Sequence, residues 1–210
     1  MSQRMRFTAA KQIFDEFPAL GESVKARPVL EAPAAFARAL LATEGPFAAI
    51  AFIAFLLPRR EAVWWGVQSV RMLAPGTAAT PAFAAADAWV RASDEGHRQA
   101  ALRLGTDGDK RLSESWLAMA ASHAGGNIAP RGVDPIPAPP QITPVAVKAA
   151  IILALAEKPA LEQAGLGEVV VEAGLRFAEG GELTFGAPAA RKPPPPRAAM
   201  PTSPALGSRR

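Results

Sequence analysis

The chain contains no cysteine and no tyrosine, two histidines, and only 7% aromatic residues in its length of 210. The absence of cysteine excludes disulfide frameworks, thiolate nucleophiles and cysteine-ligated metals. Alanine is abundant and is the strongest helix former, whereas the β-branched and aromatic residues that strands prefer are too few for a β-sandwich. We therefore predict an all-α fold, arranged as a compact bundle or as a small array of helical hairpins.

The excess of basic residues is confined to the C-terminal end. The formal net charge is +4, and residues 187–210 carry five basic residues and no acidic one. Residues 1–186 are thus left with a charge of −1, which disfavours a body that binds nucleic acid. Seven of the 24 residues in the tail are proline, so we predict a disordered Pro/Arg-rich tail that is either solvated or tethers an acidic partner.

No apolar run is long enough to cross a membrane. The longest, residues 46–57, would span about 18 Å as a helix, whereas a bilayer requires about 20 apolar residues. Because this segment is apolar on all sides, we expect it to be a buried central helix. Residues 7–20 are interrupted by charged side chains and do not form a secretory signal. We therefore expect a cytoplasmic protein without a membrane span.

Start and stop signals divide the chain into short helices. Thr80-Pro81 and Thr143-Pro144 each combine a hydroxyl cap with a proline at the first helical position. Residues 46–73 and 80–105 are expected to form two helix–corner–helix units of similar size. Helices are expected at residues 8–17, 33–42, 46–57, 59–73, 113–123, 144–156 and 167–179. A helix from residue 81 through 90 is expected to be followed by a turn near 93–94 and a helix that ends at 104. One short turn is expected at 159–165, and a β-hairpin of 175–178 with 182–185 is the alternative ending.

Six prolines in residues 130–144 exclude a helix and favour an extended segment. Because helices flank this segment, we expect an ordered strap across the surface, anchored by Val133, Ile136 and Ile142. We accordingly predict a single helical domain over residues 1–186. A division into two domains at the strap is the alternative.

Residues suited to catalysis or metal binding are few. The best cluster is Asp87, Asp94, Glu95 and His97, which we interpret as a solvated helix face around a corner. The glycine pairs fit no phosphate loop, Asp107-Gly108-Asp109 lacks the other ligands of a calcium loop, and no nucleophile elbow is present. We therefore predict no catalytic site, no metal and no cofactor, with a small metal-dependent or other enzyme using the cluster near His97 as the alternative.

The most distinctive segment is LPRREAVWW, residues 57–65. Arg59 and Arg60 fall in the first helical turn, where positive charge opposes the helix dipole. Trp64 and Trp65 point about 100° apart, so both can be buried only at a crowded junction. Two interpretations stay open: the arginines pair with acidic groups while the tryptophans fill the core, or the segment is an exposed patch for a partner, since Trp and Arg are enriched at binding hot spots.

This segment, followed by the strap ending in Ile142-Thr143-Pro144, resembles an uncharacterised family of bacterial proteins associated with type VI secretion gene clusters. The resemblance covers residues 30–160 and implies an accessory role rather than an enzymatic one. No activity is established for that family, so no functional residue is carried over.

We predict a non-catalytic accessory or adaptor protein that binds another protein. We expect this partner to belong to a secretion apparatus, of the type VI class. Arg59, Arg60, Trp64 and Trp65 are its candidate anchors. Nucleic-acid binding through the basic tail is a further alternative.

Overall fold

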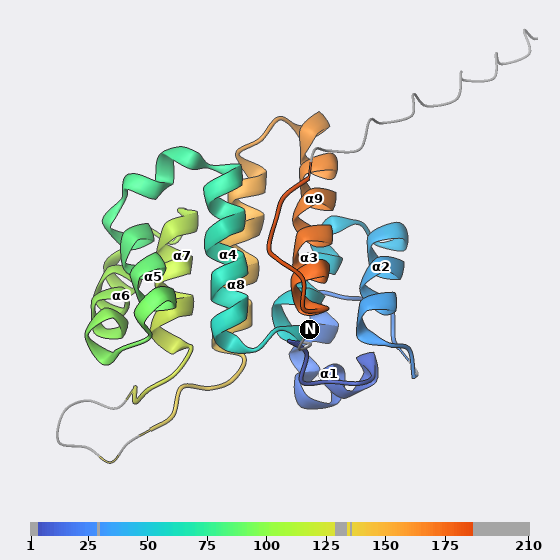
Figure 1. Cartoon of the computed structure of the whole chain (residues 1–210), viewed down its shortest axis with the longest axis horizontal. Coiled ribbons are helices and arrows are strands. Elements are labelled where there is room, and N and C mark those ends of the chain that lie inside the picture. The colour runs from blue at the N-terminus through green and yellow to red at the C-terminus, as the bar shows by residue number, and fades with distance from the viewer. Residues whose placement is uncertain (1–3, 29, 129–133, 135, 187–210) are drawn as a thin grey trace, which may run out of the picture.

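The computed structural model describes residues 4–28, 30–128, 134 and 136–186, and this part of the chain is all-α (Figure 1). The predicted fold class is therefore confirmed. The helices are α1 (Ala10–Glu16), α2 (Pro33–Thr43), α3 (Pro46–Leu56), α4 (Arg59–Leu73), α5 (Pro81–Ala92), α6 (Glu95–Asp107), α7 (Ser113–His123), α8 (Ile142–Ala156) and α9 (Ala160–Ala178), with two short 3-10 helices, η1 (Pro18–Glu22) and η2 (Pro75–Ala79). The expected C-terminal tail, residues 187–210, lies outside the described residues.

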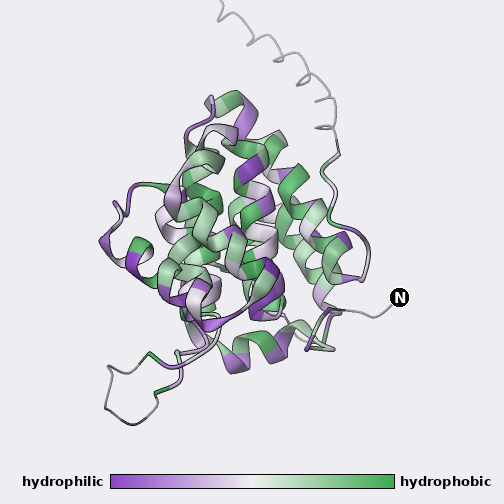
Figure 2. Cartoon of the chain, turned by 60° about the vertical axis from the view of Figure 1, so that its left-hand side comes forward, coloured by the Kyte–Doolittle hydropathy of each residue, from purple (hydrophilic) through white to green (hydrophobic). Residues whose placement is uncertain are grey.

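Two apolar helices, α3 and α8, occupy the middle of the molecule. α3 packs on α2, α8 and α9, and nine of its eleven residues are buried, as expected of a central helix. α8 packs on α3, α4 and α7, with α5 and α6 beyond α7 (Figure 1). Several of the connecting loops at the periphery are hydrophilic (Figure 2). Within the described residues, no helix combines the length and the apolarity that crossing a membrane requires.

α3 and α4 diverge after their corner instead of packing along each other as a hairpin. Leu57 and Pro58 both have extended backbone, with ψ angles of 143° and 152°. Two extended residues in succession carry α4 away from α3, so that α4 lies along α8 while α3 lies along α9. The expected helix–corner–helix pair is realised by α5 and α6, which pack closely on each other.

The two Thr-Pro signals have different outcomes. Thr80 caps α5 as predicted, since its hydroxyl accepts a hydrogen bond from the Phe83 N–H at 3.3 Å and Pro81 is the first helical residue. The prediction for Thr143 is wrong, because α8 begins at Ile142 and places Thr143 inside the first turn. Pro144 is tolerated there because the first N–H groups of a helix have no intrahelical partner.

The last helix is longer than predicted. α9 is continuous from Ala160 to Ala178, so residues 159–165 are not a separate turn, and residues 181–186 form no strand. Gly167, the expected first residue of this helix, lies inside α9 and serves packing. A side chain at Gly167 would lie 2.6 Å from Pro46 Cβ, so glycine is what allows the start of α3 to lie against α9.

Backbone pairing joins residues just before the strap to its described middle part, where a small residue is also buried. The Ile128 N–H donates to the Ile136 carbonyl at 2.9 Å, and Asn127 bridges to Pro137. Ile136, an expected anchor, is 48% exposed, whereas Ala138 is buried. The Ile136 prediction is therefore wrong; Val133 lies outside the described residues, and Ile142 is partly buried as the first residue of α8.

Candidate protein-binding surface

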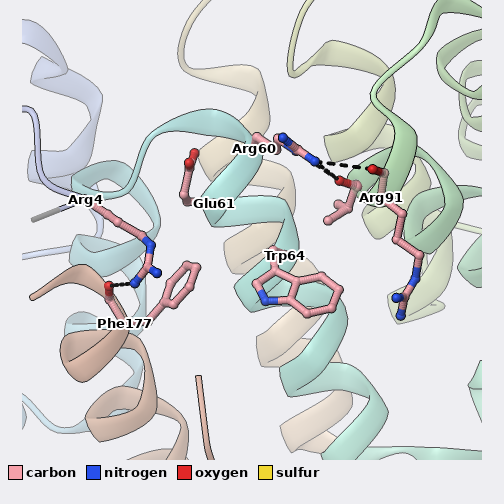
Figure 3. Close-up of a pocket in the computed structure, with 7 residues that line it drawn as sticks. Arg4, Arg60, Glu61, Trp64, Arg91 and Phe177 are labelled. Atoms are coloured by element: carbon pink, nitrogen blue, oxygen red, sulfur yellow. Dashed lines mark hydrogen bonds between the residues drawn. The ribbon is translucent and has the colours of Figure 1, made fainter. Parts of the chain in front are cut away.

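The LPRREAVWW segment begins α4, and helical geometry divides its side chains between core and surface. Ala62 and Val63 are buried in the core. At about 100° per residue, Arg60, Glu61 and Trp64 share one face of α4. These three side chains line a pocket beside α5 and α9, so the segment contributes to both the core and the surface (Figure 3).

Trp65 belongs to the core. Its side chain is fully buried, and its indole N–H donates to the Val170 carbonyl of α9 at 3.2 Å. A Cβ at Gly174 would lie 2.8 Å from the indole, so glycine at this position opens the backbone of α9 to the ring. Trp65 therefore joins α4 to α9 and is unavailable to a partner, which removes it from the candidate surface.

Arg60 closes the C-terminal end of α5. Its Nε and Nη2 donate to the Val90 carbonyl at 2.9 and 2.8 Å, and Nη2 also reaches the Arg91 carbonyl at 3.4 Å (Figure 3). The last carbonyls of a helix lack intrahelical donors and carry partial negative charge, which a guanidinium satisfies. The partner expected for this arginine was an acidic side chain, and the structure instead supplies backbone carbonyls.

The pocket is lined by arginines and aromatic rings and has a volume of about 330 Å³. The Arg4 guanidinium stacks on the Phe177 ring of α9 at 4.3 Å, and the Arg91 guanidinium lies 5.4 Å from the Trp64 ring. In Figure 3 the two rings lie between the two guanidinium groups. Trp64 is partly buried and packs against the core with part of its surface, leaving the remainder in the pocket.

One acidic side chain faces this group of arginines. Glu61 lines the pocket and makes no ion pair with any described residue. Three arginines and one glutamate therefore give the pocket a formal charge of +2. At the edge of the pocket, the Asp87 carboxylate forms ion pairs with Arg91 at 3.1 Å and with Arg71 of α4 at 3.0 Å. Asp87 is therefore shared between two arginines.

Arg59 faces a different cavity. It lines a smaller pocket of about 130 Å³, together with Arg6, Pro140 and Pro144. Arg59 makes no hydrogen bond or ion pair with any described residue. The structure thus places Arg60 and Trp64 in one pocket and Arg59 in another.

The acidic residues of the predicted cluster near His97 each contact a different neighbouring side chain in the structure. Asp94 caps α6, accepting a hydrogen bond from the His97 N–H at 2.9 Å, and its other oxygen lies 2.6 Å from His97 Nδ1. These hydrogen bonds from His97 lower the pKa of Asp94. Asp87 bonds to arginines of α4 and α5, and no group of three or more potential ligands gathers anywhere in the described ranges. The enzyme alternative stays an untested prediction.

Glu95 forms an ion pair with Arg98 within α6, and we expect the stability of the fold to depend on pH through this pair. Hydrogen bonds from Arg98 and then Gln99 lower the pKa of Glu95 from 4.5 to about 2. The folded state thus favours the ionised carboxylate, and this contribution is complete above about pH 4.5 and lost as the pH falls toward 2. Thermal unfolding from about pH 6 downward should show the Tm of the wild type approaching that of Glu95→Gln below pH 4.5; a constant difference would contradict this.

Five of the seven residues that line the pocket were not among the predicted anchors, and four of these five lie outside α4. Arg4, Val90, Arg91 and Phe177 come from the N-terminal segment and the ends of α5 and α9. Nothing in the local sequence links positions this far apart. The available signal was the pair of adjacent tryptophans, which indicates a crowded junction if both are buried.

The comparisons with known proteins identify a family without an assigned activity. No curated protein and no solved structure matches the chain. One family model matches residues 36–178, well over half of the chain, and includes Arg60, Trp64, Arg91 and Phe177 but not Arg4. The chain therefore belongs to the family of unknown function DUF6931.

Proposed function

We propose that this chain is a non-catalytic accessory or adaptor protein that binds another protein through the pocket around Trp64. The supporting observation is a partly buried tryptophan that shares a pocket with three arginines. Tryptophan and arginine dominate binding energies at protein interfaces, and anchors of this kind usually sit in pockets. Of the four candidate anchors, Arg60 and Trp64 lie in this surface.

We further propose that the partner belongs to a bacterial type VI secretion apparatus and that binding occurs in the cytoplasm. The support for this is the resemblance carried by residues 57–65 and the strap. A pocket of about 330 Å³ is at the small end for ligand sites, so it suits one or two side chains of a partner better than a whole cofactor.

Affinity capture from the native host tests this function. The full chain should retain a specific protein, and Trp64→Ala should reduce its recovery by roughly tenfold or more, because a hot-spot truncation costs about 2 kcal/mol or more. Trp116→Ala is the matched control, since Trp116 is also partly buried but lies in α7, outside the pocket. Bound proteins would be quantified by mass spectrometry.

Two results would contradict the proposal. Equal recovery with Trp64→Ala and the wild type would place binding elsewhere, and loss of the partner on truncation after Gly186 would move the function to residues 187–210. If truncation leaves capture unchanged, binding belongs to the preceding residues.

A further inference from the structure

The pocket around Trp64 keeps hydrogen-bond donors that no described residue uses. Arg60 commits Nε and Nη2 to the end of α5, which leaves Nη1. Arg91 commits Nε and Nη2 to Asp87, which also leaves Nη1. Arg4 commits Nη1 to the carbonyls of Phe177 and Gly181, which leaves Nε and Nη2. Arginine donors of this kind bind carboxylates well, and here the existing contacts already fix each guanidinium in place.

The same pocket offers an apolar surface between its charges. The Trp64 and Phe177 rings lie between the Arg4 and Arg91 guanidinium groups (Figure 3). An apolar or aromatic side chain could bury its surface on these rings, and adjacent carboxylates would then meet the arginines. The formal charge of +2 favours an anionic occupant and disfavours a cationic one, even though Glu61 faces the same space.

We propose that the pocket binds an acidic peptide segment of the partner protein, in which carboxylate side chains flank an apolar side chain. This inference rests on the proposed function and adds the chemistry of the partner. The apolar side chain lies against Trp64 and Phe177, and the carboxylates pair with the free donors of Arg4, Arg60 and Arg91. Glu61 opposes such a segment, so it limits affinity and excludes segments with too many acids.

The test uses three labelled short peptides with one central phenylalanine flanked by glutamates, by glutamines or by lysines. Fluorescence anisotropy with the full chain should show that the glutamate peptide binds at least roughly tenfold more tightly than the glutamine peptide, and that the lysine peptide does not bind. The affinity for the glutamate peptide should fall with added salt, because exposed charges are screened.

Two variants with opposite expected effects separate recognition from stability. Arg91→Gln should weaken binding of the glutamate peptide by roughly tenfold, and Glu61→Gln should strengthen it several-fold, because each changes the charge of the pocket in the opposite direction. Arg103→Ala is the control, since Arg103 is an exposed arginine of α6 outside the pocket. A disturbance of folding would weaken binding in both pocket variants, so tightening by Glu61→Gln reports charge recognition.

Two outcomes would overturn the inference. Equal affinities for the glutamate and glutamine peptides would show that charge does not select the segment, and tight binding of inorganic phosphate that displaces the glutamate peptide would show a simple anion site. If Trp64→Ala nevertheless abolishes capture of the cellular partner, the proposed function survives and only the acidic chemistry is wrong. If capture is indifferent to Trp64, the proposed function fails independently of the peptide result.

Discussion

Replacing Trp65 with alanine is expected to lower the free energy of unfolding by about 3–5 kcal/mol, in the range found for large aromatic side chains truncated in a core. The indole is fully buried between α4 and α9, and its N–H satisfies part of the Val170 carbonyl. Alanine would leave a cavity beside Gly174, which has no side chain to fill it. Surrounding helices could relax into this space only in part.

The neighbouring tryptophan supplies the comparison. Trp64→Ala should cost about 1 kcal/mol, since the side chain is only partly buried and makes no hydrogen bond with a described residue. Equilibrium unfolding in urea would measure both variants, with Trp65→Phe separating the loss of volume from the loss of the N–H donor. Equal destabilisation by Trp64→Ala and Trp65→Ala would contradict the assignment of one tryptophan to the surface and the other to the core.

Arg98→Ala is expected to destabilise the fold by about 2–4 kcal/mol, because it leaves two carbonyls without their donor. The Arg98 side chain is only 2% exposed and donates to the Ser122 and Asn127 carbonyls at 2.9 Å each. These carbonyls lie at the end of α7 and in the loop that follows it. The ion pair with Glu95 contributes less, since that carboxylate is largely exposed.

Arg111→Ala is the matched control for Arg98→Ala. Arg111 also pairs with a nearby carboxylate, that of Asp109, but its side chain is 89% exposed, so the change should stay within about 0.5 kcal/mol. Hydrogen exchange would locate the effect: Arg98→Ala should increase exchange at residues 122–128 first, because the loop there loses its attachment to α6. Unchanged exchange in this loop would refute the role assigned to Arg98.

The sequence predicted the helices well where the signal is local. Thr80-Pro81 starts a helix through one hydroxyl and one fixed φ angle, and both act on adjacent residues. The apolar run that became α3 needed no knowledge of its neighbours to be assigned to the core. The same local rules failed at Gly167, where glycine is needed because Pro46 lies close, 121 positions earlier in the chain.

The candidate site shows the same limit. The adjacent tryptophans indicated that both could be buried only at a crowded junction, yet the sequence did not reveal whether either lies at the surface. That choice depends on Gly174, which admits Trp65, and on Arg91, which lies beside Trp64. Both residues come from other helices, and their effect arises only when tertiary packing brings them to α4.

Site-specific photo-crosslinking in living cells tests the central claim most directly. A photoreactive amino acid would be placed at position 64, with positions 103 and 116 as controls outside the pocket. We expect one specific crosslinked protein from position 64 and none of that protein from either control. Crosslinking of the same protein from the control positions, or from none of the three, would contradict binding through the pocket around Trp64.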